Sequence, residues 1–255
     1  MNTFICLLGQ DFRRRSRDGF FIGYNIIFPL VLILILGYLS SESYGNGFTG
    51  YQYYGIVTLP FCIALSIITA AYAAKEEAYR QTALRFLFTP ITRFQLVLSR
   101  LLSCTIILGI CNLVVLLFTV LILKLPVKMN FLAVLTLLTV LGFAICSVGL
   151  FIGYGIRNFI LIKNILNIPV MAAGILAGAF YPFGSLNPGW EIVIRLSPLT
   201  WVNRSIFYCI YDDESVLLWK VTGLCLLTGM AFISLAVLFF KKEEYIHGEL
   251  PGYEK

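Results

Sequence analysis

The chain has 255 residues, of which 59% are hydrophobic and only 13% are charged, and its mean hydropathy is +0.89. A soluble domain of this length carries about 25% charged residues, so the composition argues against one. The net charge of +6 at pH 7 would suit a nucleic-acid-binding protein, but the basic residues flank apolar runs instead of forming one patch. We therefore expect a membrane protein, with the lipid bilayer and no nucleic acid among its partners.

Six apolar runs are long enough to cross a bilayer, which takes roughly 20 residues. They lie at 20–39, 56–74, 101–123, 131–155, 160–181 and 221–240. The first run follows four arginines but has no small-residue cleavage site, so we expect a retained span, bent at Pro29, and no signal peptide. The prediction is an all-α integral membrane protein with six transmembrane helices in a single domain over 1–255.

The distribution of positive charge predicts the orientation of these spans. Six spans put both ends of the chain on one side, together with 75–100 and 156–163, and that side holds fourteen of the nineteen Lys and Arg residues. The opposite side holds the other five: Lys124, Lys128, Arg195, Arg204 and Lys220. Because cytoplasmic loops are enriched in Lys and Arg, we expect both termini in the cytoplasm.

Cysteine and histidine give no sign of a metal or catalytic site. None of the seven cysteines forms a CxxC pair, and most lie inside the predicted spans, where cysteine behaves as a small hydrophobe. Only Cys209 is expected on the outer side, and the one histidine, His247, lies in the charged tail. We expect no disulfide and no bound metal.

The acidic residues bear on the energy source for any transport. All thirteen fall outside the six runs: Asp11, Asp18, Glu42, Glu76, Glu77, Glu191, Asp212, Asp213, Glu214, Glu243, Glu244, Glu249 and Glu254. Ion-driven carriers usually bind the coupling ion at ionisable groups within the membrane, so the hypothesis that this chain is a secondary carrier is weakened. It is not excluded, because backbone carbonyls also coordinate sodium.

Nucleotide-binding and protease motifs are absent from the sequence. It contains no GxxxxGK[ST] phosphate loop, no HExxH and no GxSxG. We expect no catalytic residue and no ATPase site in this chain, so uphill transport would need energy from a separate partner.

Residues 75–100, KEEAYRQTALRFLFTPITRFQLVLSR, form the longest polar segment between two apolar runs. Helical periodicity covers their first part, and the helix should end before Pro90, because the residue preceding proline is forced out of the helical region. The next helix has two candidate caps: Thr89 with Pro90 at the first position, or a capping box of Thr92 and Gln95. Periodicity alone fits an interfacial helix lying on lipid headgroups.

The same segment resembles the coupling-helix region of ABC type-2 exporter permeases, the membrane subunits of ATP-binding-cassette transporters. The family pattern has a glutamate, a Gly-Thr pair, a hydrophobic helix, a Ser/Thr-Pro step and a basic residue three positions later. The matching residues are Glu77, Thr82, Leu87, Thr89, Pro90 and Arg93. The family glycine is replaced by Gln81, which should stiffen this turn. In the family this helix docks in a groove of the ATPase, which implies an ATPase-coupling role for these six residues.

A second segment, 177–204, is broken by prolines into pieces too short to span yet too apolar for a free loop. A re-entrant hairpin between spans five and six is the structure we expect, since irregular backbone is tolerated at membrane depth when it packs against protein; an interfacial aromatic loop is the alternative. The segment is similar to the external hairpin and gate of the same family. The residues that carry this similarity are Tyr181, Pro182, Pro188, Trp190, Pro198, Leu199 and Thr200.

The resemblance extends over the whole chain, including a basic amphipathic helix around 3–18 and the KKEEY tail after the last run. It implies a permease subunit that pairs with a second permease, identical or homologous, and with two ABC ATPase subunits that bind ATP and Mg. Such a complex would sit in the bacterial cytoplasmic membrane and export an amphipathic or hydrophobic compound (drug, antibiotic, peptide or lipid), as in antibiotic resistance. The alternative is a membrane sensor or immunity subunit that binds such a compound without sustained transport.

Small residues mark two candidate helix-packing faces. Gly149 and Gly153 form a GxxxG motif in the fourth run, and Gly174 and Gly178, each following an alanine, repeat this spacing in the fifth. Such spacing lets helices approach closely in membranes.

Overall fold

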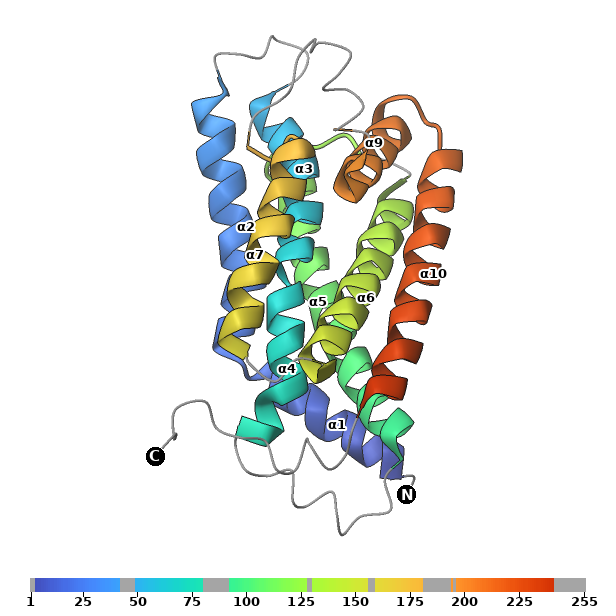
Figure 1. The fold of residues 1–255 in the computed structure, drawn as a ribbon. Helices are drawn as coiled ribbons and strands as arrows, with labels where there is room; N and C mark the ends of the chain where they lie inside the picture. Colours follow the sequence, from blue (N-terminus) through green and yellow to red (C-terminus); the bar gives the residue numbers. More distant parts are fainter. Residues whose placement is uncertain are drawn as a thin grey trace.

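The computed structural model describes residues 3–41, 49–79, 92–127, 130–155, 159–180, 194 and 196–240, with only the backbone described for 76–79 and 159–163. The regular elements in these ranges are helices. They are α1 (Thr3–Ser16), α2 (Gly19–Leu39), α3 (Gly50–Leu65), α4 (Ile67–Tyr79), α5 (Arg93–Leu121), α6 (Phe131–Gly155), α7 (Phe159–Leu176), α9 (Pro198–Tyr211) and α10 (Val216–Phe239) (Figure 1). The all-α prediction is confirmed.

Five helical segments among the described residues are long and apolar enough to cross a membrane. They are Gly19–Leu39, Gly50–Lys75, Arg93–Leu121, Phe131–Gly155 and Val216–Phe239. The remaining predicted run, 160–181, coincides with α7, whose apolar stretch Asn164–Leu176 is shorter than a span. Five of the six predicted spans are therefore found as helices of spanning length, and the span predicted over 160–181 stays a prediction.

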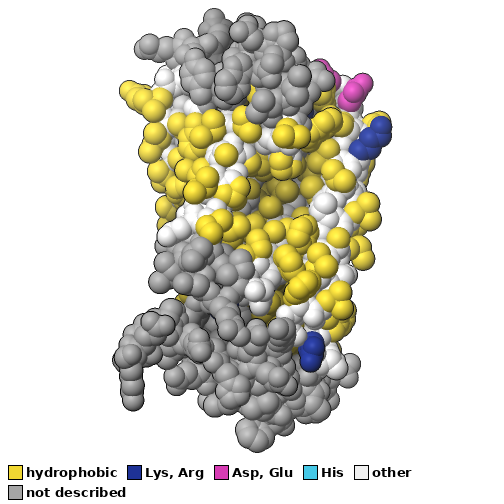
Figure 2. Space-filling view, in the orientation of Figure 1, with side chains coloured by type: hydrophobic (Ala, Val, Ile, Leu, Met, Phe, Trp, Pro, Cys, Tyr) yellow, Lys and Arg dark blue, Asp and Glu magenta, His cyan; other side chains and the backbone are white. Residues whose placement is uncertain are grey.

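The helices form a bundle with two distinct ends (Figure 1). At one end, α1 runs across the bundle and packs against α5; we call this the α1 end. At the other, the short helix α9 lies beside α3 and α10, and we call this the α9 end. Figure 2 shows a largely apolar surface between the two ends, with the visible charged side chains close to them. This pattern fits a bundle that crosses a bilayer.

The α3–α4 segment is the centre of the bundle. In its most apolar window 89% of the residues are buried, against 22% for α2 and for α10. Its helix is interrupted at Ser66, whose hydroxyl donates to the Ile63 carbonyl at 2.6 Å, while Thr69 donates to the Ser66 carbonyl at 2.7 Å. Hydroxyl groups that bond back to the preceding turn bend helices. The sequence predicts one continuous run here, and these local bonds divide it into two helices.

The GxxxG prediction in the fourth run is confirmed by the packing of α6 against α4. A Cβ atom on Gly149 would lie 2.6 Å from the Ile67 carbonyl oxygen, and one on Gly153 would lie 2.6 Å from the Ala71 carbonyl oxygen. Both distances are shorter than real Cβ contacts, so only glycine allows this approach. In the fifth run a Cβ on Gly174 would collide with the Phe61 ring of α3.

The amphipathic N-terminal helix predicted around 3–18 is α1 (Thr3–Ser16). Its Leu7 is buried, whereas Ile5 and Arg13 are exposed. At the opposite end of the bundle Cys209, expected on the outer side, belongs to α9 with its side chain fully buried. Burial raises the pKa of that thiol, which makes it unreactive.

Candidate functional site

Of the predicted coupling residues, Glu77 and Arg93 fall at the α1 end, where α4 ends and α5 begins. Thr82, Leu87, Thr89 and Pro90 lie outside the described residues. Glu77 belongs to the last turn of α4, with its side chain not described. The site is therefore built from the two helices that flank this segment and from what holds them.

The start of α5 is set by a capping box. The Thr92 hydroxyl accepts from the Gln95 backbone N–H at 3.3 Å, and the Gln95 side chain accepts from the Thr92 N–H at 3.2 Å. These bonds satisfy two N–H groups that have no partner within the helix. Of the two caps offered by the sequence, α5 uses Thr92. Arg93 is then the first residue of α5, and its side chain is exposed.

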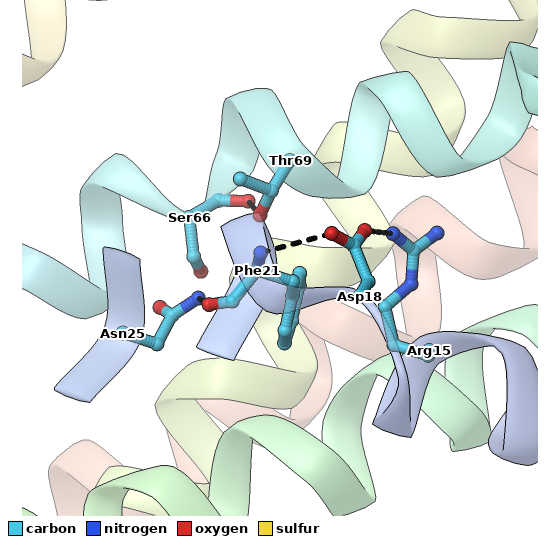
Figure 3. Close-up of polar contacts among 6 residues, drawn as sticks. All are labelled: Arg15, Asp18, Phe21, Asn25, Ser66 and Thr69. Carbon is cyan, nitrogen blue, oxygen red and sulfur yellow. Dashed lines mark hydrogen bonds and ion pairs between the residues drawn. The ribbon is translucent and has the colours of Figure 1, made fainter. Parts of the chain in front are cut away.

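A charged corner joins α1 to α2 at the same end (Figure 3). The Asp18 carboxylate accepts from the Phe21 backbone N–H at 3.1 Å and so caps α2. Its other oxygen pairs with the Arg15 guanidinium at 3.0 Å. The same guanidinium lies 5.2 Å from the centroid of the Phe21 ring. This corner holds α1 across the end of the bundle.

The first turns of α2 also contain a buried amide. The Asn25 side chain donates to the Phe21 carbonyl one turn earlier at 2.8 Å (Figure 3). Asn25 is only 3% exposed, and a buried amide without a partner would be costly. The bond within α2 makes its burial tolerable.

Two serines of α5 attach α1 to the bundle. The Ser99 hydroxyl donates to the Asp11 carboxylate at 2.8 Å, and the Ser103 hydroxyl donates to the Leu8 carbonyl at 3.4 Å. Burial raises the pKa of the Asp11 carboxyl above its ordinary value, although Arg100 and the Ser99 hydrogen bond act in the opposite direction. Asp11 thus sits partly desolvated between α1 and α5.

Arg100 connects several helices at this end. It is only 5% exposed, and its Nη1 atom donates to the Ala74 carbonyl of α4 at 2.9 Å and to the Tyr154 hydroxyl of α6 at 3.1 Å. The Tyr154 ring in turn packs edge-on against Phe240, directly after α10, with centroids 4.9 Å apart. One buried cation therefore links α4, α5 and α6, and through Tyr154 the end of α10.

At the opposite end, α9 caps α7. Side chains of α9 and of its N-cap, Ser197, donate to carbonyls at the end of α7 and just beyond it, where a helix leaves acceptor capacity unused. Ser197, Thr200 and Asn203 donate to the carbonyls of Ala173 at 3.2 Å, Leu176 at 3.4 Å and Ala177 at 3.0 Å. The polar residues at the start of α9 thus fix it to the end of α7.

Two tyrosines of α3 hold the chain as it leaves α7. The Tyr53 hydroxyl donates to the Gly178 carbonyl, and the Tyr54 hydroxyl to the Phe180 carbonyl, both at 3.2 Å. Gly178 has a φ of 77°, a conformation that glycine adopts without strain and that commonly ends helices. These two hydrogen bonds therefore fix the backbone of residues 178–180 directly after α7.

The residues predicted for the external hairpin are located only in part. Pro198 occupies the first turn of α9, and Leu199 and Thr200 are buried, with Leu199 packed near Ala179 and Phe61. Tyr181, Pro182, Pro188 and Trp190 lie outside the described residues. The re-entrant hairpin thus stays a prediction, and its Pro-Leu-Thr step forms the first turn of α9.

The family model of the ABC-2 type transporter matches residues 2–211. This range runs from α1 through α9 and covers most of the chain. The chain belongs to the ABC-2 type transporter family. No curated protein matches it in sequence. As a permease subunit of this family, it is a multi-pass membrane protein without an ATPase site of its own.

Several residues that organise this ABC-2 permease carry no signal in the family pattern. Arg100 closes the polar stretch 75–100 and counts there as one more cytoplasmic charge, whereas the structure places it inside α5 and buries it. Asp11 and Tyr154 are equally inconspicuous in the sequence. A charged residue within an otherwise apolar helix is the one sequence feature that could have identified Arg100, since such residues are rarely without a role.

Within the described ranges no group of three or more His, Cys, Asp or Glu side chains is placed to hold a metal ion. At the α1 end of the ABC-2 permease, α4 ends and α5 begins, and buried hydrogen bonds join these two helices to each other and to α6.

Proposed function

We propose that the chain is the permease subunit of an ATP-driven exporter. Two ABC ATPase subunits, which bind ATP and Mg, dock at the α1 end, and a second permease, identical or homologous, completes the complex. The α1 end faces the cytoplasm of a bacterium, so both termini are cytoplasmic. The substrate is an amphipathic or hydrophobic compound (drug, antibiotic, peptide or lipid) that leaves the cytoplasm or the inner leaflet.

The observation that carries this proposal is the position of the 80–91 segment in the chain. It connects α4 to α5, and α4 continues the most buried segment of the bundle. A displacement of this connection at the membrane surface therefore acts directly on the central helices. An ATPase bound to this segment could convert its own nucleotide-driven closure into movement of α4 and α5, since packed interfaces shift between discrete arrangements.

The membrane-exposed surface is consistent with an apolar substrate. Large hydrophobic side chains are exposed along α2, α7 and α10, including Ile168 at 73% and Leu227 at 67%. Lipid and an apolar substrate favour the same surface, so the chemistry of the substrate is proposed only as a class. The residues predicted for the external hairpin, from Tyr181 to Thr200, would close the outer side of the pathway.

The first experiment is a mild-detergent purification of the affinity-tagged chain from its native membranes, with the co-purifying proteins identified and ATP hydrolysis measured. We expect an ABC ATPase to co-purify. Movement of a candidate compound into inside-out vesicles upon ATP addition would then support export. Binding that stimulates no hydrolysis and no transport would favour the sensor or immunity subunit. Recovery of no ATPase with an active chain would favour an ion-driven carrier.

The docking residues are tested in the same preparation. We expect Glu77→Ala and Arg93→Ala to reduce the recovery of the ATPase or its stimulation while leaving membrane insertion unchanged. Lys220→Ala is the matched control, because Lys220 is also an exposed basic residue but belongs to α10 near the α9 end. Full ATPase recovery and stimulation in both variants would contradict the assigned docking roles.

A further inference from the structure

We propose that Arg100 is a positioning residue that locks the α1 ends of α4, α5 and α6 together, so that a force applied to the 80–91 segment moves them as one unit. This inference rests on the proposed function and adds a residue outside the docking segment. It assigns Arg100 no contact with the ATPase or with substrate.

The first argument is the burial of the charge. An arginine inside a membrane helix is costly unless its charge is compensated and its N–H groups have partners. Arg100 is 5% exposed and lies near the Asp11 carboxylate. The two side chains line a small cavity together with Arg14, Arg15, Ala73, Ser103 and Cys104. A leucine would fill this position without that cost. The arginine is therefore explained better by what it connects than by packing.

The second argument is the geometry of its contacts. The Nη1 atom, which carries two N–H groups, donates two hydrogen bonds, and their acceptors belong to two different helices. Ala74 lies a turn before the end of α4, and Tyr154 lies in the last turn of α6. The cation thus ties the helix that enters the 80–91 segment to the helix that follows α5 in the chain. Because these bonds act between helices, they resist relative displacement.

The third argument is that the helices around Arg100 are closely packed. A Cβ on Gly153, next to Tyr154, would lie 2.6 Å from the Ala74 Cβ, so α4 and α6 touch directly beside the arginine. On its other side, Ser99 bonds to Asp11 of α1. Packed contacts of this kind transmit displacement between discrete arrangements instead of absorbing it.

The test separates a positioning role from a role in stability. Arg100→Met removes the charge but keeps an unbranched apolar side chain, at a cost in stability because the nearby Asp11 loses this counter-charge. Arg100→Lys is the conservative variant, because one ammonium nitrogen can serve both acceptors. Tyr154→Phe removes one acceptor and keeps the ring on Phe240. The matched control is Ser147→Ala, which deletes a buried hydrogen bond that stays within α6.

Each variant is purified as the complex with its co-purifying ATPase. We measure the recovery of ATPase, the thermal midpoint, and amide hydrogen exchange in residues 197–211 with and without ATP and vanadate. In the wild type, nucleotide trapping should change exchange at this distant end. In Arg100→Met, and in Tyr154→Phe with its thermal midpoint near that of the wild type, we expect the change to fall, by about fivefold or more in Arg100→Met, with ATPase recovery preserved. Arg100→Lys should restore most of it, and Ser147→Ala should leave it intact.

The outcomes are distinguishable. If Arg100→Met and Tyr154→Phe keep the full nucleotide-dependent change, the inference is wrong although the proposed function stands. If Arg100→Met does not yield a folded complex, Tyr154→Phe and Arg100→Lys decide: a wild-type response in Tyr154→Phe contradicts the inference, and a reduced one supports it. If the wild type recovers no ATPase, the proposed function fails and this role of Arg100 fails with it. If the wild type recovers the ATPase but shows no change in 197–211 on trapping, the inference alone is wrong.

Discussion

The close approach of α6 to α4 leads to a prediction that can be worked out from the structure. Gly153 lies near the end of α6 beside Ala71 and Ala74. In Gly153→Ala the new methyl carbon would lie 2.6 Å from the Ala71 carbonyl oxygen and 2.6 Å from the Ala74 Cβ. Carbon atoms pack favourably at about 3.5–4.0 Å. The two helices must therefore separate locally by about 1 Å.

The cost of this separation is that of an overpacked core, about 1–3 kcal/mol. For a chain of this size each kcal/mol lowers the thermal midpoint by about 2–4 °C, so we expect a decrease of about 2–12 °C. The displacement also moves the Ala74 carbonyl, which accepts from Arg100 at 2.9 Å. A further 1 Å takes that bond beyond ordinary hydrogen-bond length, so the nucleotide-dependent response of the α9 end should weaken as well.

The assay is thermal unfolding of the purified complex, followed by intrinsic fluorescence, in the same detergent for each variant. The control is Gly223→Ala in α10, where a Cβ would meet no heavy atom within 4 Å. There alanine should be neutral or slightly stabilising, by up to about 1 kcal/mol of helix propensity. A Gly153→Ala variant as stable as wild type, with an unchanged Gly223→Ala, would refute the argument that α4 and α6 touch at this glycine.

Three further predictions concern single contacts. Burial raises the pKa of Asp11, so ionisation of this carboxyl destabilises the folded state as the pH rises through that pKa. The thermal midpoint of Asp11→Asn should therefore lie above that of the wild type at pH 7, and the difference should vanish towards pH 3. A less stable variant at pH 7 would contradict this. Asp18→Ala removes the cap of α2 and should cost about 1 kcal/mol in the free energy of unfolding. Tyr54→Phe deletes the hydroxyl that bonds to Phe180 and should also cost about 1 kcal/mol, while increasing amide exchange in 177–180; unchanged exchange there would show that the bond does not hold this segment.

Local signals in the sequence predicted the features of the fold that depend on near neighbours. Long apolar runs identified the membrane-spanning helices, because each helix satisfies its own backbone within the bilayer. The Thr92–Gln95 capping box fixed the start of α5, since both bonds form within four residues. The GxxxG spacing at Gly149 predicted a close helix contact, although it did not say that α4 is the partner.

Only the tertiary structure decided which distant residues meet. The buried Arg100 depends on Ala74 and Tyr154, which lie 26 and 54 positions away, and Tyr53 reaches a carbonyl 125 positions along the chain. No periodicity or motif encodes such pairs, because they depend on how the helices pack. The sequence by itself therefore determined that this is a multi-helix membrane subunit of the ABC-2 kind. The packing determined how its two ends are held, because the polar groups there find their partners on other helices.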